Sequence, residues 1–109
     1  MSPQIAWTAL VAAGLLDVGW AISMKYADGY TRPGWSLLSL GLLAAFVFLL
    51  GRALQVLPVG TAYAAWTGIG AVGTVLMGVV LFGETLSPVR IGGIALVLVG
   101  IVALKLAPS

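Results

Sequence analysis

Residues 5–24 read IAWTALVAAGLLDVGWAISM, a stretch of twenty residues in which Asp17 is the only ionisable side chain. About 20 mainly apolar residues in a helix can cross a hydrocarbon layer roughly 30 Å thick. The stretch therefore predicts a membrane-spanning helix over about 4–25 with one carboxylic acid inside it. Three further apolar runs predict helices over about 34–54, 59–82 and 88–106.

Turn-forming residues separate the four runs. The first break holds ADGYTRPG (27–34), the second ends at Pro58 and the third ends at Pro88. A proline is tolerated in the first turn of a helix, because the amide hydrogen that it lacks would be unpaired there. We expect a single all-α domain over residues 1–109, made of four transmembrane helices.

The composition excludes several classes of protein. Hydrophobic residues make up 61% of the chain and charged residues 7%, whereas roughly a quarter of the residues of a soluble domain are charged. With neither cysteine nor histidine, disulfides and the usual zinc sites are excluded. We expect no metal and no cofactor. Nucleic-acid binding is not expected, since the five cations are scattered singly instead of forming a basic patch.

Lysine and arginine are almost evenly divided between the two sides of the predicted bundle. Lys25, Arg32 and Arg90 lie on one side, and Arg52, Lys105 and the terminal amine on the other. Because this asymmetry sets orientation, a balanced chain can insert both ways and supply antiparallel partners. A fixed orientation set by one or two charges is the alternative. We expect the charged residues at the ends of the apolar runs to set membrane topology and to have no chemical role. These residues are Arg32, Glu84, Arg90 and Lys105.

Asp17 is the candidate functional group. An ionisable residue at such depth costs roughly 2.5 kcal/mol or more and usually marks an ion or proton pathway. Loss of water disfavours the charged carboxylate, so a proton can compete with a cation for it. Alternating exposure of one shared site to the two faces would then produce antiport. The alternative is a structural acid that stays protonated and hydrogen-bonded. No second catalytic group accompanies Asp17, so we do not expect an enzyme.

Helical spacing places a set of residues around Asp17. The stripe on the first helix comprises Gly14, Asp17, Trp20, Ala21 and Met24. Tyr63 and Trp66 share a face of the third helix by the same rule. Aromatic residues at this spacing often serve packing, but they can also bind a cation near a carboxylate. We expect Trp20, Tyr63 and Trp66 to line the site. The expected interfacial anchors are Trp7 and Trp35.

Glycines form two patterns in the apolar runs. Residues 68–73 (GIGAVG) match the dinucleotide-binding fingerprint letter for letter, but they lie inside an apolar span instead of following a strand. We expect Gly68 and Gly70 to permit a bend or a close helix contact. Gly93 and Gly100 share one face of the last helix and predict a packing seam between subunits. The alternative is that Gly93 and Gly100 face lipid and have no role.

The chain resembles the small multidrug resistance transporters across nearly its whole length. Residues 57–70 (LPVGTAYAAWTGIG) look like the third-helix signature of that family. Residues 17–21 (DVGWA), followed by Lys25-Tyr26 and residues 29–32 (GYTR), look most like the guanidinium-exporter branch. Trp20 is the telling residue, since the polyaromatic-drug branch carries a small residue there. The resemblance implies an antiparallel homodimer in the inner membrane that exchanges protons for small organic cations.

The resemblance also implies roles for individual residues. Asp17 would bind both proton and substrate. The implied pocket walls are Trp20, Tyr63 and Trp66, the implied bend is at Gly68 and Gly70, and the implied dimer seam is at Gly93 and Gly100. We also expect Gly14 and Phe46 to line the pocket.

Two departures from the family pattern bear on the substrate. The family has glutamate where this chain has Asp17, and the shorter arm changes the reach to substrate and shifts proton competition toward lower pH. The guanidinium branch also has a serine-phenylalanine pair in the second helix. Ungapped alignment places Phe46 and Val47 there, and one gap places Ala45 and Phe46, so the hydroxyl is missing either way.

Three functions remain open at this point. The leading hypothesis is a proton-coupled exporter of guanidinium or substituted guanidinium ions, which Trp20 favours. A broad-specificity exporter of quaternary ammonium or aromatic cations is the first alternative, and Phe46 favours it. The second alternative is a membrane subunit that does not itself transport.

Overall fold

A computed structural model of the chain describes residues 2–107, which form four helices and no strand. The helices are α1 (Pro3–Tyr26), α2 (Pro33–Leu54), α3 (Val59–Phe82) and α4 (Pro88–Leu106). Each is long and apolar enough to cross a membrane. The prediction of an all-α protein with four long apolar helices is confirmed.

Local sequence signals begin and end the helices. The backbone N–H of Ile5 donates to Ser2 Oγ (3.2 Å) at the start of α1, and that of Arg90 donates to Ser87 Oγ (3.2 Å) at the start of α4. A proline follows each of these serines, as suits the first turn of a helix. At the end of α3, Gly83 adopts φ +66°, a left-handed conformation that glycine adopts without steric cost.

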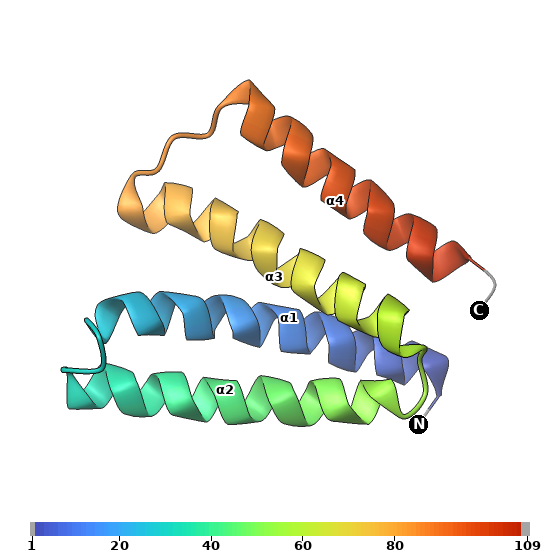
Figure 1. Cartoon of the computed structure of the whole chain (residues 1–109), viewed down its shortest axis with the longest axis horizontal. Helices are drawn as coiled ribbons and strands as arrows, with labels where there is room; N and C mark the ends of the chain where they lie inside the picture. The colour runs from blue at the N-terminus through green and yellow to red at the C-terminus, as the bar shows by residue number, and fades with distance from the viewer. Residues whose placement is uncertain (1, 108–109) are drawn as a thin grey trace.

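The helices are packed unequally. α1 packs extensively against α2 and also against α3, whereas the backbone of α4 packs close to α3 alone among the helices (Figure 1). No residue of α4 is buried. Because lipid chains are as apolar as leucine, outward-facing apolar side chains carry no penalty in a membrane. The single chain is therefore a three-helix core with a fourth helix held along one side.

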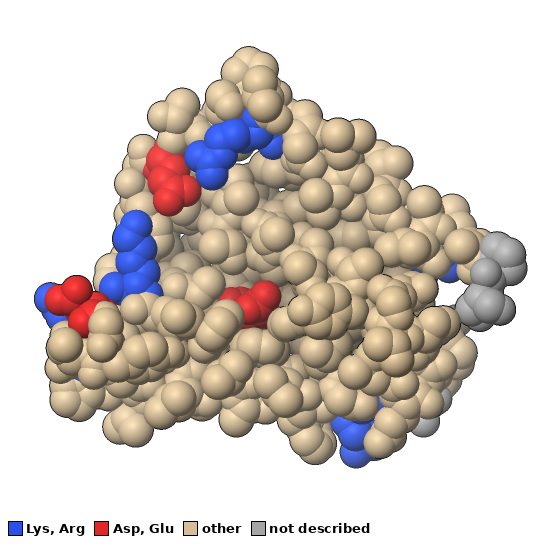
Figure 2. All heavy atoms as spheres, viewed as in Figure 1, with Lys and Arg blue, Asp and Glu red and all other residues tan. Residues whose placement is uncertain are grey.

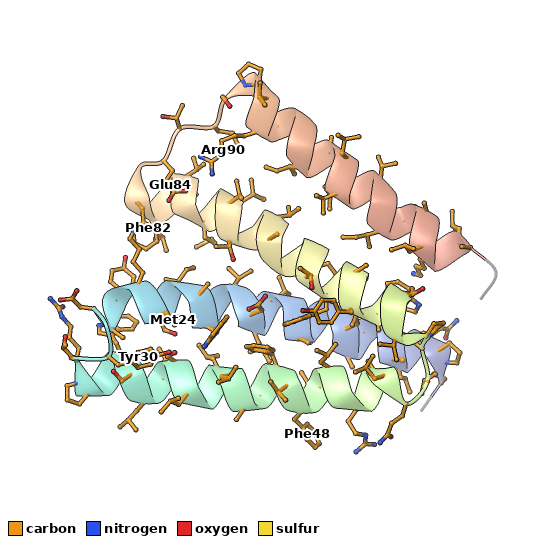
Figure 3. The ribbon with its side chains drawn as sticks, in the orientation of Figure 1. Met24, Tyr30, Phe48, Phe82, Glu84 and Arg90 are labelled. Carbon is orange, nitrogen blue, oxygen red and sulfur yellow. The ribbon has the colours of Figure 1, made fainter. Side chains whose placement is uncertain are left out.

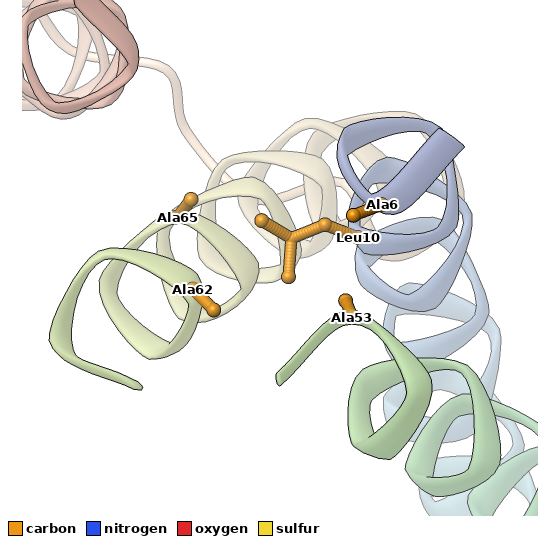
Figure 4. Packing of buried hydrophobic residues seen from close by; sticks show 5 residues of the cluster. All are labelled: Ala6, Leu10, Ala53, Ala62 and Ala65. Atoms are coloured by element: carbon orange, nitrogen blue, oxygen red, sulfur yellow. The ribbon is translucent and has the colours of Figure 1, made fainter. Parts of the chain in front are cut away.

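Small residues bring α1, α2 and α3 close together at the end of the bundle that holds the N-terminus. The side chain of Leu10 is fully buried there, and it lies among four alanines (Figure 4), which are Ala6, Ala53, Ala62 and Ala65. Alanine at a helix contact lets the two backbones approach closely. Leu10 therefore fills the space that these short side chains leave.

We expect Leu10→Ala to lower the free energy of unfolding by about 2 kcal/mol, because it leaves a cavity and removes van der Waals contacts. Unfolding by SDS in detergent micelles, followed by circular dichroism, measures the change. Leu37→Ala is the matched control, since Leu37 is 70% exposed on α2 and its truncation should cost little. Equal losses in the two variants would contradict this account of the core.

The connection between α3 and α4 is held by polar contacts at the other end of the bundle (Figure 3). Arg90 Nη2 lies 3.6 Å from Glu84 Oε1, and Arg90 Nη1 donates to the carbonyl of Thr85 (2.7 Å). Glu84 in turn lies against Gly78, where a Cβ would come within 2.8 Å of the Glu84 Cδ. These contacts fix the position at which α4 begins.

Candidate functional site

Asp17 lies within α1, and its carboxylate faces α3 at Gly70. A Cβ added to Gly70 would lie 3.2 Å from Asp17 Cγ and closer still to the Oδ2 atom. Glycine at this position therefore makes the room that the carboxylate occupies. Within residues 2–107, Asp17 forms no ion pair. Figure 2 shows most charged side chains near the ends of the bundle and one acidic side chain in its middle.

Four aromatic side chains from three helices form a continuous cluster, in which Trp20 lies one turn after Asp17 on α1. The ring of Phe46 lies 5.5 Å from that of Trp20 and 5.5 Å from that of Trp66, between centroids. Tyr63 meets Trp66 edge to face at 5.4 Å. Phe46 on α2 thus joins Trp20 of α1 to Trp66 of α3. The structure brings together the four aromatic residues that the sequence suggested for a pocket.

The two tryptophans of this cluster carry hydrogen-bond donors without acceptors. The Nε1 atoms of Trp20 and Trp66 are both buried, and neither has a hydrogen-bond partner among the residues that the structure describes. A buried donor without an acceptor costs about 1–3 kcal/mol. The cluster therefore contains two buried N–H groups that the described residues leave without an acceptor. Sequence reasoning treated these residues only as aromatic faces and missed the donors.

Gly14 belongs to the contact between α1 and α3. A Cβ on Gly14 would lie 2.9 Å from the Cβ of Ile69. Gly14 is thus a position of close helix approach, one turn before Asp17 on the same helix. Because Gly14 has no side chain, α3 comes near enough for Gly70 to contact the carboxylate of Asp17.

The other glycines divide into those that face a neighbouring helix and those that do not. A Cβ on Gly68 would lie 2.9 Å from Ile101 Cδ1, at the contact of α3 with α4. α3 runs as one uninterrupted helix through Gly68 and Gly70, so a bend there remains a prediction. A Cβ on Gly93 or Gly100 would meet nothing within 4 Å among the described residues. That face of α4 is uncovered within the single chain.

The buried hydroxyl group of Ser39 in α2 lies away from the aromatic cluster. Ser39 is fully buried, and its Oγ shares a hydrogen bond with the hydroxyl of Tyr30 (2.9 Å). Ser39 precedes Phe46 by seven residues, which is about 10 Å along a helix. Sequence reasoning did not single out Ser39, although it is a polar residue inside an apolar run. Its hydroxyl ties the first loop to α2.

Comparison with known proteins gives consistent similarities over almost the whole chain. The sequence profile of the family described as Small Multidrug Resistance protein matches residues 5–97. A guanidinium exporter of Yersinia pseudotuberculosis serotype I (strain IP32953) is 55% identical over 103 residues, which cover 94% of this chain and 99% of that protein. Guanidinium exporters of Escherichia coli (strain K12) and Citrobacter freundii are 47% and 46% identical over 103 residues, which cover 94% of this chain and 98% of each.

Proposed function

This chain belongs to the Small Multidrug Resistance protein family, and we propose that it exports guanidinium or substituted guanidinium ions in exchange for protons. It is a transporter and not an enzyme, and it is a multi-pass protein of the inner membrane.

The position of Asp17 is the observation that carries the proposal. It is an acid within a membrane span, it rests against Gly70, and it forms no ion pair within residues 2–107. A carboxylate free of a fixed partner can bind a cation when ionised and loses that ability when protonated. Proton and substrate therefore exclude each other, and this exclusion is what couples their movements in opposite directions.

The aromatic cluster supports a guanidinium-class substrate. A guanidinium ion is planar, donates parallel hydrogen bonds to a carboxylate and stacks on aromatic faces. Asp17 would supply the acceptor, and Trp20, Phe46, Tyr63 and Trp66 would supply the faces. Gly14 would contribute by letting α3 approach α1 beside the carboxylate. The relatives that are named guanidinium exporters support the same substrate.

One alternative substrate class keeps specific support. The ring of Phe46 at the centre of the cluster would also favour quaternary ammonium or aromatic cations, as in a broad-specificity exporter. The buried Ser39 hydroxyl bonds to Tyr30 and supplies no second polar contact at Phe46.

We place the functional site in an antiparallel homodimer. α4 has no buried residue, and its Gly93 and Gly100 face open space within the single chain, which suits a seam between two copies. The near balance of lysine and arginine supports insertion in both orientations. Gly68 and Gly70 would let α3 bend during the exchange.

A substrate panel tests the proposed function. Proteoliposomes containing only this chain are exposed to guanidinium, phenylguanidinium and tetraethylammonium, and the proton-coupled currents are recorded. We expect currents with guanidinium and phenylguanidinium that exceed the current with tetraethylammonium. The reverse order would favour the broad-specificity exporter, and no current with any of the three would contradict the proposed exchange of these cations for protons.

Proton competition also predicts a pH dependence of binding. Only the ionised fraction of Asp17 binds a cation. In the pH range where Asp17 is mostly protonated, the apparent affinity for guanidinium should therefore fall by up to about tenfold for each unit by which the pH is lowered. Once Asp17 is fully ionised, the affinity should become independent of pH. Binding measured by tryptophan fluorescence in detergent between acid and alkaline pH checks this. An affinity that does not change over the whole range would contradict competition at Asp17.

A further inference from the structure

A groove of about 880 Å³ opens between the first half of α1, the middle of α3 and the last turns of α4. Most of its lining is apolar, and the residues that define it are Trp7, Val11, Leu15, Ile69, Ile101 and Lys105. The backbone of α4 packs close to that of α3 but not to that of α1, so much of this side of α1 is uncovered within the described chain. Leu15, for example, is 60% exposed.

The groove is separate from the proposed transport site. Leu15 and Asp17 are two residues apart on α1, which is about 200° around a helix. Asp17 faces Gly70, whereas Leu15 faces the groove. A ligand in the groove would therefore lie on the other side of α1 from the carboxylate and the aromatic cluster.

One end of the groove is positively charged. Lys105 Nζ lies 5.7 Å from the centre of the Trp7 ring, and this cation–π contact holds the ammonium group at the end of the groove. Among residues 2–107, no acidic side chain lines the groove. The acidic loop residues Asp28 and Glu84 follow α1 and α3, at the opposite end of the bundle from the beginning of α1 and the end of α4 (Figure 1).

The length of the groove corresponds to one leaflet of a bilayer. Its lining on α1 runs from Pro3 to Leu15, a rise of about 18 Å, and half of a hydrocarbon core is roughly 15 Å. The charged end with Trp7 and Lys105 lies at the end of both helices, where headgroups sit and where tryptophan is favoured. The apolar end at Leu15 and Ile69 lies near the middle of the membrane.

We propose that this groove binds an anionic phospholipid, with an acyl chain along α1 and α4 and the phosphate group at Lys105. A zwitterionic lipid would fill the same apolar space, but its headgroup carries no net charge to attract the ammonium group. One basic residue near the membrane surface gives about a fivefold preference for an anionic lipid. Transport is not needed for this binding, so its test stands apart from that of the proposed function.

Quenching of Trp7 fluorescence tests the proposal. The full chain is reconstituted in phosphatidylcholine bilayers that contain a small fraction of phosphatidylglycerol or phosphatidylcholine with brominated acyl chains. Subtracting the signal of Trp7→Phe isolates the contribution of Trp7 from those of the other tryptophans. We expect brominated phosphatidylglycerol to quench Trp7 at about one fifth of the concentration that brominated phosphatidylcholine requires.

Variants of the cations locate the headgroup. Lys105→Gln should remove the preference, and Lys105→Arg should keep it. Arg52→Gln removes a cation at the same end of the bundle that does not line the groove, and it should also keep the preference. Equal quenching by the two lipids in the natural chain, or an unchanged preference in Lys105→Gln, would overturn the proposal. If neither brominated lipid quenches the fluorescence of Trp7, the proposal is also overturned, and a second copy of the chain covers the groove instead.

Discussion

Asp17→Asn is expected to reduce guanidinium-driven proton flux in proteoliposomes to the level of liposomes without protein. Asparagine has nearly the shape of aspartate, so the contact with Gly70 and the packing of α1 should persist. It cannot ionise, however, and so it offers neither a proton nor a negative charge to exchange. A pH-sensitive dye trapped inside the vesicles, with guanidinium added outside, measures the flux.

Two variants control for effects other than the loss of this carboxylate. Asp28→Asn makes the same chemical change in the first loop, outside the helices, and should leave the flux within about twofold of the natural chain. Asp17→Glu restores the acid with one more methylene, and we expect it to transport with proton competition moved to higher pH. Flux that persists in Asp17→Asn would remove the mechanism.

Gly70→Ala should lower the transport efficiency for guanidinium on the order of a hundredfold, because it displaces the carboxylate on which binding depends. A methyl group at residue 70 would lie 3.2 Å from Asp17 Cγ, with Oδ2 closer still, so the acid must move. A displacement of about 1 Å at a reacting group can cost about 10²-fold. Initial rates over a range of guanidinium concentrations, in proteoliposomes of equal protein content, measure the effect.

Gly51→Ala is the matched control for this substitution. Gly51 is also inside a helix, but a Cβ there would meet nothing within 4 Å among the described residues. Both changes raise helix propensity by the same amount, so a difference between them reports the contact with Asp17. We expect Gly51→Ala to stay within about twofold of the natural chain. Full activity in Gly70→Ala would show that the carboxylate does not act from its position beside α3.

The helices could be predicted from the sequence because each is a long apolar run bounded by turn residues. Length and composition alone decide this in a membrane, where the backbone must satisfy its own hydrogen bonds. The starts of α1 and α4 also follow from local chemistry, since Ser2 and Ser87 cap them. None of these inferences needs contacts between distant parts of the chain.

The arrangement of the site depends on such contacts, and it could be predicted only in part. Asp17 and its aromatic neighbours follow from depth in the membrane and helical spacing. The contact between Asp17 and Gly70 does not, because it requires the register of α1 against α3. Phe46 joining Trp20 to Trp66 likewise requires the position of α2 relative to both other helices.

The charged residues at the helix ends show the same limit. Because Glu84, Arg90 and Lys105 lie at the ends of the apolar runs, the sequence predicts only a role in membrane topology for them, which is the usual role of such residues. The structure pairs Arg90 with Glu84 across the α3–α4 connection and places Lys105 over Trp7. Both contacts arise from where α4 begins and ends relative to the other helices, which no periodicity in the sequence encodes.

The most direct test of exchange at a single carboxylate is the number of protons released when guanidinium binds. Isothermal titration calorimetry of the chain in detergent, in two buffers of different ionisation enthalpy, gives this number at each pH. We expect about one proton per bound cation where Asp17 starts protonated, and none where it starts ionised. Guanidinium binding without proton release at every pH would show that the two ions do not share Asp17.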